Sequence, residues 1–315
     1  MSLTGRTVLI TGGTGSWGRC AVKRWLALPD GPARIIVLAD SEGSHAAMRA
    51  ADPCYAPGPR LDYFIGNVRD RRRLVFAFRP ADVVVHAAAQ KEVASCEYNL
   101  FEAVETNVLG SQNVVESAIA TGVERVLLLS TDKACAPYTS YGKTKALAED
   151  LFTRGNSLAG AGPTRFASVR YGNIRGSRAS VIPIWQACVE RGEPISVTDA
   201  RMSRYWWELD QAVQFVEWAL EVMHGGEVFV PRLDSSPISA LADDIVPAGW
   251  PRRETGIATR EKLHEYLVSE DEAINTVEVE NGYVILPSHP SWPFTPPVGS
   301  RPVPEGFSYS SREVA

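Results

Sequence analysis

The chain has 315 residues, enough for one large domain or two modest ones with a substantial core. Hydrophobic residues make up 45% and charged residues 22%, an ordinary globular composition that excludes a disordered or fibrous chain. With 32 basic against 37 acidic residues the formal net charge is −5, so charge offers no argument for binding nucleic acid.

Cysteine spacing and the lengths of apolar runs exclude further classes. The five cysteines are scattered, with no C-x-x-C pair and no metal-ligand spacing, so we expect reduced thiols and no metal. No apolar run approaches the roughly 20 residues that span a bilayer. A polar glycine loop near the N-terminus leaves no room for a signal peptide. We therefore expect a soluble cytoplasmic protein with neither membrane nor nucleic-acid partners.

Predicted strands and helices alternate through the first half of the chain. Short apolar runs predict strands at Thr7–Thr11, Ile35–Ala39, Leu61–Ile65, Val83–His86, Arg125–Ser130 and Arg165–Arg170. Helical spacing predicts helices at Trp17–Leu28, Phe101–Ala120 and Tyr141–Phe152. Because the strands are apolar throughout and alternate with helices, we expect an α/β fold with a Rossmann-type, doubly wound parallel sheet.

After Asn173 the predicted strands shorten and prolines recur. This texture indicates a smaller, irregular unit followed by an extended, proline-rich tail. We expect an NAD-binding Rossmann domain at residues 1–172, to which a helix at about residues 208–224 returns. Residues 173–315 would then form a substrate-binding domain and an extended C-terminal tail.

A glycine loop follows the first predicted strand. Gly12, Gly15 and Gly18 stand three apart, directly after a strand and at the start of a helix. Glycine allows a tight turn and a close approach to a pyrophosphate, which then meets the amides of the helix N-terminus. The loop therefore predicts a dinucleotide site.

Asp40 ends the second predicted strand, about twenty residues beyond the glycines. A carboxylate there can accept hydrogen bonds from ribose hydroxyls and would repel a 2′-phosphate. The alternative is a turn-forming aspartate in Asp40-Ser-Glu-Gly43. We favour the ribose contact, and hence NAD over NADP.

Tyr141 and Lys145 lie four residues apart on one predicted helix, so their side chains share a face. An ammonium near a phenol favours the phenolate, so we expect Lys145 to lower the pKa of Tyr141. Tyr141 could then take a proton from an alcohol while the cofactor takes the hydride. The hydroxyls of Ser130 and Thr131, at the end of the preceding strand, could orient that alcohol.

Asp132 and Lys133 follow at the carboxyl end of the same strand, where ligands bind in open parallel sheets. Oxidising a sugar alcohol to a ketone makes the neighbouring C–H acidic. We expect Lys133, with a depressed pKa, to remove that proton, and a protonated Asp132 to help expel a hydroxyl one carbon further on. Each residue alone is more often an ordinary loop charge.

These residues resemble the extended short-chain dehydrogenase/reductase superfamily. Within it, the chain is similar to the inverting UDP-N-acetylglucosamine 4,6-dehydratases of pseudaminic acid and capsule biosynthesis. The motifs that carry the resemblance span most of the chain: His86–Val93, Thr106–Val114, Ser130–Ala134, Val169–Asn173, Gly176–Arg178, Thr198–Arg204, Gly225–Pro231, Glu261–Glu265 and Glu305–Ser311.

The resemblance implies chemistry on carbons 4, 5 and 6 of a nucleotide-linked hexose. Tyr141 would deprotonate the 4-hydroxyl, Lys133 would remove the carbon-5 proton, and Asp132 would protonate the departing 6-hydroxyl. The hydride would return to carbon 6, and reprotonation would invert carbon 5. The cofactor is regenerated, so the enzyme would be a lyase acting on UDP-GlcNAc or a related nucleotide sugar, and we expect a homo-oligomer.

The expected site residues form three sets. The catalytic set is Thr131, Asp132, Lys133, Tyr141 and Lys145. The cofactor set is Gly12, Thr14, Gly15, Ser16, Trp17, Gly18, Asp40, Ser41, Asn67, Val68, Ala87, Ala88, Lys91, Tyr141 and Lys145. The substrate set is Lys91, Asn173, Ile182, Thr198, Met202, Arg204 and Arg260; Arg201 would suit a diphosphate by charge or serve as a surface residue.

The chain departs from the family pattern at several of these places. Ala39-Asp40 replaces the Ser-Arg pair that holds the 2′-phosphate of NADP, which again favours NAD. Asn67 replaces an aspartate expected to face adenine, and Glu92 replaces a neutral residue beside Lys91. Ala258 stands where the family has an arginine for the nucleotide diphosphate, and Arg260 is the nearby substitute.

Two other functions compete with the dehydratase. An NAD-dependent nucleotide-sugar epimerase or oxidoreductase would use Tyr141 and Lys145 but not the Asp132-Lys133 pair. A non-catalytic dinucleotide-binding protein would keep the fold alone, and the intact Tyr141/Lys145 pair argues against it.

Overall fold

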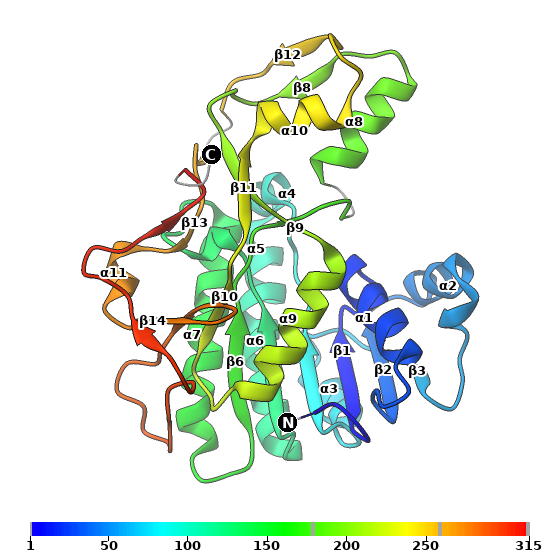
Figure 1. Ribbon diagram of the computed structural model, residues 1–315. Coiled ribbons are helices and arrows are strands. Elements are labelled where there is room, and N and C mark those ends of the chain that lie inside the picture. The colour runs from blue at the N-terminus through cyan, green and yellow to red at the C-terminus, as the bar shows by residue number, and fades with distance from the viewer. Residues whose placement is uncertain (1, 178–179, 258–259, 313–315) are drawn as a thin grey trace.

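The computed structural model describes residues 2–177, 180–257 and 260–312. Figure 1 shows a broad sheet with helices on both faces. A smaller group of elements lies beyond one end of its strands. Both the predicted fold class and the predicted parallel sheet are confirmed. None of the helices in the described residues is long and apolar enough to cross a bilayer.

Within the described residues the main sheet has ten strands. They are β1 (Thr7–Thr11), β2 (Arg34–Ala39), β3 (Leu61–Ile65), β4 (Val83–His86), β5 (Arg125–Leu129), β6 (Arg165–Val169), β10 (Val228–Pro231), β14 (Thr276–Val279), β15 (Gly282–Ile285) and β16 (Arg301–Pro302). Their order is β16-β14-β15-β10-β6-β5-β4-β1-β2-β3. The seven strands from β10 to β3 pair in parallel, and β15, β14 and β16 extend the sheet antiparallel.

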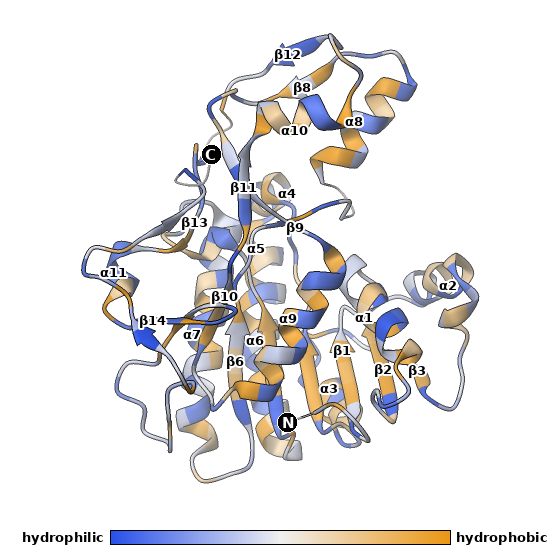
Figure 2. Ribbon diagram, viewed as in Figure 1, coloured by the Kyte–Doolittle hydropathy of each residue, from blue (hydrophilic) through white to orange (hydrophobic). Residues whose placement is uncertain are grey.

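Two layers of helices cover this sheet. One face carries α1 (Ser16–Ala27) and α9 (Leu209–Val222), and the other carries α3 (Arg71–Phe78), α6 (Gly110–Thr121) and α7 (Ser140–Ala159). Successive side chains of a strand point to opposite faces of the sheet, so each strand contributes to two apolar cores, one on each face. Val8 and Ile10 belong to the first core, beneath α1 and α9, and Leu9 belongs to the second. Figure 2 accordingly shows the central strands apolar and the helices apolar on one side.

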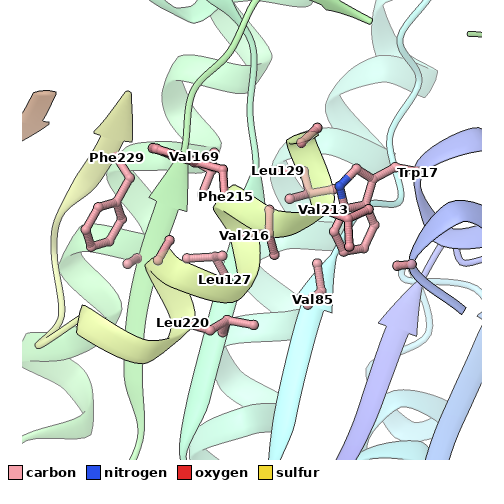
Figure 3. Close-up of a cluster of buried hydrophobic side chains, with 14 of the residues drawn as sticks. Trp17, Val85, Leu127, Leu129, Val169, Val213, Phe215, Val216, Leu220 and Phe229 are labelled. Carbon is pink, nitrogen blue, oxygen red and sulfur yellow. The ribbon is translucent and has the colours of Figure 1, made fainter. Parts of the chain in front are cut away.

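The first core closes around α9, the helix that returns to the sheet from the second half of the chain. Figure 3 shows Val213 and Val216 of α9 facing Leu127 and Val85 of the strands. Each buried side chain of this kind contributes about 1.5–3 kcal/mol. The expected returning helix at about residues 208–224 is thus found at Leu209–Val222.

The predicted helix at Phe101–Ala120 contains an irregular segment. It is built from α5 (Leu100–Ala103), a π-helical stretch (Val104–Leu109) and α6. The π turn carries Asn107, whose buried amide exchanges hydrogen bonds with the backbone of Gln90 (2.8 and 2.9 Å) and donates to Thr144 Oγ1 (3.0 Å). This one side chain therefore joins the segment after β4 to helix α7.

A smaller unit lies beyond the carboxyl ends of the parallel strands (Figure 1). It contains α8 (Val181–Glu190), α10 (Ile238–Ile245), β8 (Ile195–Val197) and β12 (Arg252–Glu254) around its own apolar cluster. A three-stranded sheet of β7 (Asn173–Ile174), β9 (Ser203–Trp207) and β11 (Asp234–Pro237) joins it to the main body. The shorter elements are α2 (Glu42–Ala51), α4 (Val93–Tyr98), α11 (Glu270–Ala273), β13 (Tyr266–Val268), β17 (Tyr309–Ser310) and 3₁₀ turns at Pro53–Tyr55 and Asp132–Ala134.

The second half of the chain does more than form this smaller unit. β10 pairs with β6, and β14 to β16 continue the main sheet, so the sheet itself crosses the predicted domain boundary at residue 173. Among the first-half elements, β1, β3 and β4 lie at their predicted bounds, whereas α7 runs on to Ala159.

Candidate active site

A cavity of about 850 Å³ lies at the carboxyl ends of the parallel strands. Its walls come from the glycine loop, from the segments after β2 to β6, and from the smaller unit. Of the expected site residues, those that line it are Gly12, Thr14, Gly15, Ser16, Trp17, Gly18, Asp40, Asn67, Val68, Ala87, Ala88, Lys91, Thr131, Lys133, Tyr141, Lys145, Asn173, Thr198, Met202 and Arg204. Residues far apart in the sequence thus meet in one site.

The glycine loop needs glycine for steric reasons. Gly12 has φ +64°, and a Cβ there would lie 2.7 Å from Cα of Ala88, in the segment that follows the neighbouring strand β4. Helix α1 begins at Ser16 with Gly15 as its N-cap, and no side chain caps its amides. The first turn also contains no acidic residue. The loop therefore presents an uncapped, positively polarised helix end to the cavity, which suits a pyrophosphate.

The adenosine end of such a ligand would lie near Asp40. This side chain is exposed at the end of β2 and lines the cavity. Ser41 does not line it; its hydroxyl accepts a hydrogen bond from Ser44 N (3.3 Å) and caps α2. Asn67 lines the cavity, but its Oδ1 already accepts from Arg69 N (2.9 Å), so its amide NH₂ is the group available for hydrogen bonding.

Helix α7 is placed so that Tyr141 faces the segment that carries Lys133. Thr139 caps the helix by accepting from Gly142 N (2.9 Å). A Cβ on Gly142 would lie 2.1 Å from the carbonyl oxygen of Lys133, so only glycine permits this approach. The glycine inside Tyr141-Gly-Lys-Thr-Lys145 is therefore what brings the two predicted catalytic segments together.

The expected lowering of the Tyr141 pKa is wrong for the chain itself. Burial raises the pKa of Tyr141 to about 12, and the Lys133 charge and the Thr131 hydroxyl oppose that rise only in part. Lys145 is itself buried, which lowers its pKa to about 8, and its Nζ donates to Leu129 O (2.8 Å). The largest opposing charge at Tyr141 is therefore Lys133, and not Lys145.

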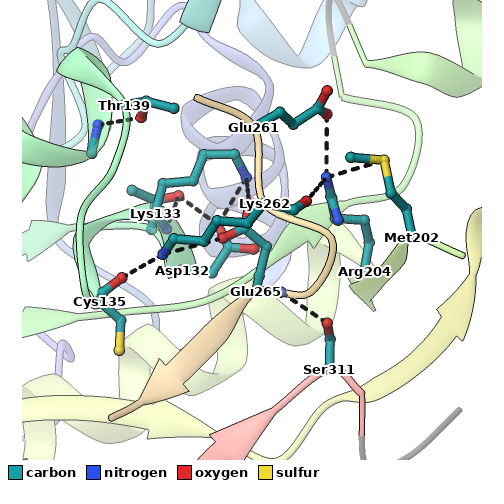
Figure 4. Close-up of polar contacts among 12 residues, drawn as sticks. Asp132, Lys133, Cys135, Thr139, Met202, Arg204, Glu261, Lys262, Glu265 and Ser311 are labelled. Carbon is teal, nitrogen blue, oxygen red and sulfur yellow. Dashed lines mark hydrogen bonds and ion pairs between the residues drawn. The ribbon is translucent and has the colours of Figure 1, made fainter. Parts of the chain in front are cut away.

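Lys133 sits between two carboxylates (Figure 4). Its Nζ lies 3.0 Å from Asp132 Oδ1 and 3.4 Å from Glu265 Oε1. Burial alone would lower the pKa of Lys133, but these two carboxylates outweigh it and raise the pKa. The expected depressed pKa of Lys133 is therefore wrong, because Asp132 and Glu265 together outweigh burial, and the sequence gives no sign that Glu265 packs beside the amine.

Asp132 lies behind Lys133 and does not line the cavity. Its side chain is fully buried, and Oδ1 accepts hydrogen bonds from Lys133 Nζ (3.0 Å) and Thr131 Oγ1 (2.9 Å). Oδ2 has no hydrogen-bond partner among the described residues. Since Lys133 and Thr131 both line the cavity, any proton from Asp132 would reach a ligand through one of them.

Arg204 of strand β9 and Met202, the residue just before that strand, lie at the far end of the cavity. Arg204 is 5% exposed, and its guanidinium contacts Glu261 Oε1 (3.2 Å), Ser203 O (2.8 Å) and Met202 Sδ (3.7 Å). The arginine is thus held in a fixed orientation with one edge on the cavity. Thr198 and Asn173 line the same end.

Besides Ser41 and Asp132, three more of the residues considered in the sequence analysis lie outside the cavity wall. Ile182 is buried in the apolar cluster of the smaller unit and is not part of the cavity wall. Arg260 forms an ion pair with Glu97 (2.9 Å), also outside the wall, and Arg201 pairs with Asp199 on the surface (2.7 Å). Ala258 lies outside the described residues.

The sequence interpretation missed several residues of the cavity wall. Trp206 follows Met202 and Arg204 at the two-residue spacing of one strand face, and that alternation could have identified it. Its indole Nε1 is buried without a hydrogen-bond partner among the described residues. Glu261, Tyr171 and Trp185 also line the cavity.

The amino-acid sequence is similar to those of known proteins. Residues 8–287 match the family model described as "Polysaccharide biosynthesis protein". The chain is 42% identical over 284 residues to a UDP-N-acetylglucosamine 4,6-dehydratase (inverting) of Campylobacter jejuni, covering 90% of this chain and 83% of that one. It is 35% identical over 285 residues to a UDP-glucose 4-epimerase of Rickettsia conorii, covering 89% and 82%.

Solved structures share the fold. Pen from Bacillus thuringiensis superposes with a TM-score of 0.91 at 32% identity, covering 100% of this chain and 95% of that one. DesIV, a dTDP-glucose 4,6-dehydratase from Streptomyces venezuelae, superposes with a TM-score of 0.72 at 24% identity, covering 82% and 86%.

Proposed function

The chain belongs to the polysaccharide biosynthesis protein family, and within it we propose that this protein is a nucleotide-sugar 4,6-dehydratase, a hydro-lyase. One observation carries the proposal: Lys133 and Tyr141 line the same cavity, beside the glycine loop. A dehydrogenase needs only the tyrosine and its lysine. A second amine on the same wall, backed by a buried carboxylate, supplies the acid and base of an elimination.

The glycine loop, the uncapped start of α1 and Asp40 fit a dinucleotide, and we propose NAD. When bound, NAD would supply hydride transfer between carbons 4 and 6 of the sugar and a positive charge that favours the phenolate of Tyr141. Asp40 supports NAD over NADP, because its carboxylate can accept from ribose hydroxyls and would repel a 2′-phosphate.

At carbon 4, the residues of the chain handle one proton. Tyr141 takes the proton of the 4-hydroxyl, and Thr131, which hydrogen-bonds to Tyr141, orients that hydroxyl. Lys145 holds its buried position through Leu129 O and lies one helical turn from Tyr141. The 4-keto group that results makes the carbon-5 proton acidic.

At carbons 5 and 6, the Asp132–Lys133 pair completes the elimination. Lys133 becomes neutral when it passes its proton to Asp132 across their 3.0 Å contact; the neutral amine then takes the carbon-5 proton and becomes an ammonium again. Asp132 in its acid form gives a proton, through Lys133 or Thr131, to the departing 6-hydroxyl, which leaves as water. Return of a proton to carbon 5 from the opposite face would invert that carbon, and the product is a 4-keto-6-deoxy sugar.

The far end of the cavity would hold the rest of the nucleotide sugar. Arg204 is the buried cation suited to a diphosphate, and the unpartnered indole N–H of Trp206 suits a polar atom of the sugar or base. We propose UDP-GlcNAc or a close relative, since the Campylobacter jejuni relative is named for that substrate. Residues 1–172 with α9 would then bind the cofactor and residues 173–315 the substrate.

Measurement of product mass tests the proposal. The purified protein is incubated with NAD and a panel of UDP- and dTDP-linked hexoses, and each product is weighed by mass spectrometry. We expect loss of one water from UDP-GlcNAc or a near relative, with no net NADH. Accumulation of NADH with a product of oxidised mass would refute the dehydratase.

A 4-epimerase is the second candidate, because the Rickettsia conorii relative carries that name. An epimerase would return a product with the substrate's own mass and an inverted carbon 4. It would also not depend on Lys133, so a Lys133→Ala variant would keep its turnover. The same mass measurement therefore separates the two reactions.

We also propose that the enzyme is a cytoplasmic homo-oligomer. Tyr98 and Phe101 are large apolar side chains that are 90% and 86% exposed, close together at α4 and α5, which supports a partner surface. The five cysteines are all free, which suits a reducing compartment. Light scattering of the purified protein would give the subunit number.

A further inference from the structure

Glu265 is a buried carboxylate that the reaction above does not use. It is 2% exposed and immediately precedes β13. Its Oε1 lies 3.4 Å from Lys133 Nζ, and its Oε2 lies 3.7 Å from Lys262 Nζ. Lys133 is part of the cavity wall, whereas Glu265 is not, so Glu265 contacts the amine from within the protein; Figure 4 shows Glu265 beside Lys133.

The backbone of Glu265 is anchored by the end of the chain. Glu265 N donates to Ser311 Oγ (3.0 Å), and Ser311 N donates to Glu265 O (2.9 Å). Ser311 is itself fully buried and also contacts Ser203 Oγ (2.9 Å). Two segments far apart in sequence thus hold one carboxylate against Lys133. A buried charge is costly unless it is paired, so this arrangement indicates a specific role for Glu265.

The surroundings of Lys133 contain charges of both signs. Facing it are Asp132 on its own turn, Glu265, Arg204 from β9 and the phenol of Tyr141 from α7. Lys262 faces Glu265 from the other side, and Glu261 pairs with Arg204 (3.2 Å). Three carboxylates therefore balance three cations, and removal of Glu265 would leave an excess of positive charge around Lys133.

We propose that Glu265 is a positioning residue for the carbon-5 base: it holds the Lys133 amine beside Asp132 and stabilises the ammonium that forms when Lys133 takes the proton. This inference rests on the proposed dehydration. The Asp132–Lys133 pair carries one shared proton in its active form, and the 3.0 Å contact allows that proton to lie on either partner. Glu265 keeps Lys133 basic enough to accept the carbon-5 proton.

The sign of the pH effect follows from this charge state. The pair becomes inactive when it loses its shared proton, which happens as the pH rises through the pKa of Lys133. In a Glu265→Gln variant the ammonium is less stabilised, so that pKa falls. We expect the alkaline limb of the dehydration rate to move to lower pH by about one unit or more. The rate at its optimum should fall roughly 10- to 100-fold, less than loss of the base itself.

The test compares four proteins with their cofactor bound: wild type, Glu265→Gln, Glu265→Asp and Glu270→Gln. Glu270 is an exposed carboxylate five residues further on, so its variant controls for loss of charge alone. We expect Glu265→Asp to recover much of the rate and the alkaline limb, and Glu270→Gln to match wild type. Single-turnover oxidation at carbon 4 should be unchanged in Glu265→Gln, because it depends on Tyr141.

A ligand-free measurement separates this inference from the proposed function. The Lys133 amine is titrated by NMR in protein with ¹³C-labelled lysine, with Lys133→Arg for assignment. A lower pKa of Lys133 in Glu265→Gln than in wild type supports the inference. An unchanged pKa, or an unchanged alkaline limb with wild-type rate, overturns it. If the Lys133 pKa falls but wild type dehydrates no nucleotide sugar, the proposed function fails and the contact between Glu265 and Lys133 stands.

Discussion

Lys133 and Asp132 are neighbours in sequence, and their pairing could be predicted from the residues alone. Their electrostatic setting could not. Burial lowers the pKa of Lys133, but Asp132 and then Glu265, which comes from the other half of the chain, outweigh burial and raise it. The pKa of Tyr141 is raised by burial, which a sequence motif does not report. At the residue scale, therefore, the sequence identifies which groups meet, and packing determines how strongly each holds its proton.

Asp40 allows a direct test of cofactor choice at this scale. An Asp40→Asn variant keeps the shape of the side chain and removes its charge. We expect wild type to bind NAD more tightly than NADP, and the variant to lose about tenfold of that preference, since a charged hydrogen bond contributes roughly 1.5–3 kcal/mol.

Fluorescence or calorimetric titration of both dinucleotides would measure this. Glu42→Gln, a change of the same kind two residues on and outside the cavity wall, should leave the preference unchanged. Tighter binding of NADP than NAD by wild type would contradict the interpretation of Asp40.

At the element scale, buried polar side chains join the strands and helices that carry the site. His86, the last residue of β4, contacts Thr11 Oγ1 on β1 (2.7 Å) and Ser111 Oγ on α6 (3.2 Å), and it stacks on Phe152 of α7. Asn107 makes a similar joint from the π turn. The sequence predicted these elements by periodicity, but it did not reveal the π-helical stretch at Val104–Leu109.

His86 makes stability depend on pH in a defined window. Burial and then the Lys145 charge lower its pKa from 6.5 to about 3. Between these values the unfolded chain binds more protons than the folded one, so stability falls as the pH drops from 6.5 toward 3. The contribution lost between pH 7 and pH 5 is about 2 kcal/mol.

A His86→Gln variant removes the titrating group while keeping polar atoms at the site. Urea denaturation at pH 7 and pH 5 would give the free energy of unfolding of both proteins. We expect wild type to lose about 2 kcal/mol more than the variant on acidification. An equal loss in the two proteins would show that His86 does not titrate as described.

At the scale of the whole molecule, the parallel strands β1 to β6 were predictable, whereas β10 and the antiparallel edge were not. β1 to β6 are apolar runs separated by helices, a local pattern that specifies parallel pairing. β14, β15 and β16 are short; β15 pairs with β10, β14 with β15 and β16 with β14, so their places in the sheet depend on contacts across the whole chain. Glu265 and Ser311 flank β13 and β17, which pair in a separate two-stranded sheet, so elements that the sequence did not reveal also support Lys133.

In this account the enzyme oxidises carbon 4 and then eliminates water across carbons 5 and 6, with both steps in one cavity. Turnover of UDP-GlcNAc in deuterated water, with the product examined by NMR, tests it most directly. We expect one solvent deuterium at carbon 5 of a dehydrated product, and in Lys133→Ala a rate roughly 10²- to 10⁴-fold lower. A product that keeps its original carbon-5 proton, or a Lys133→Ala variant that exchanges at the wild-type rate, would contradict the account.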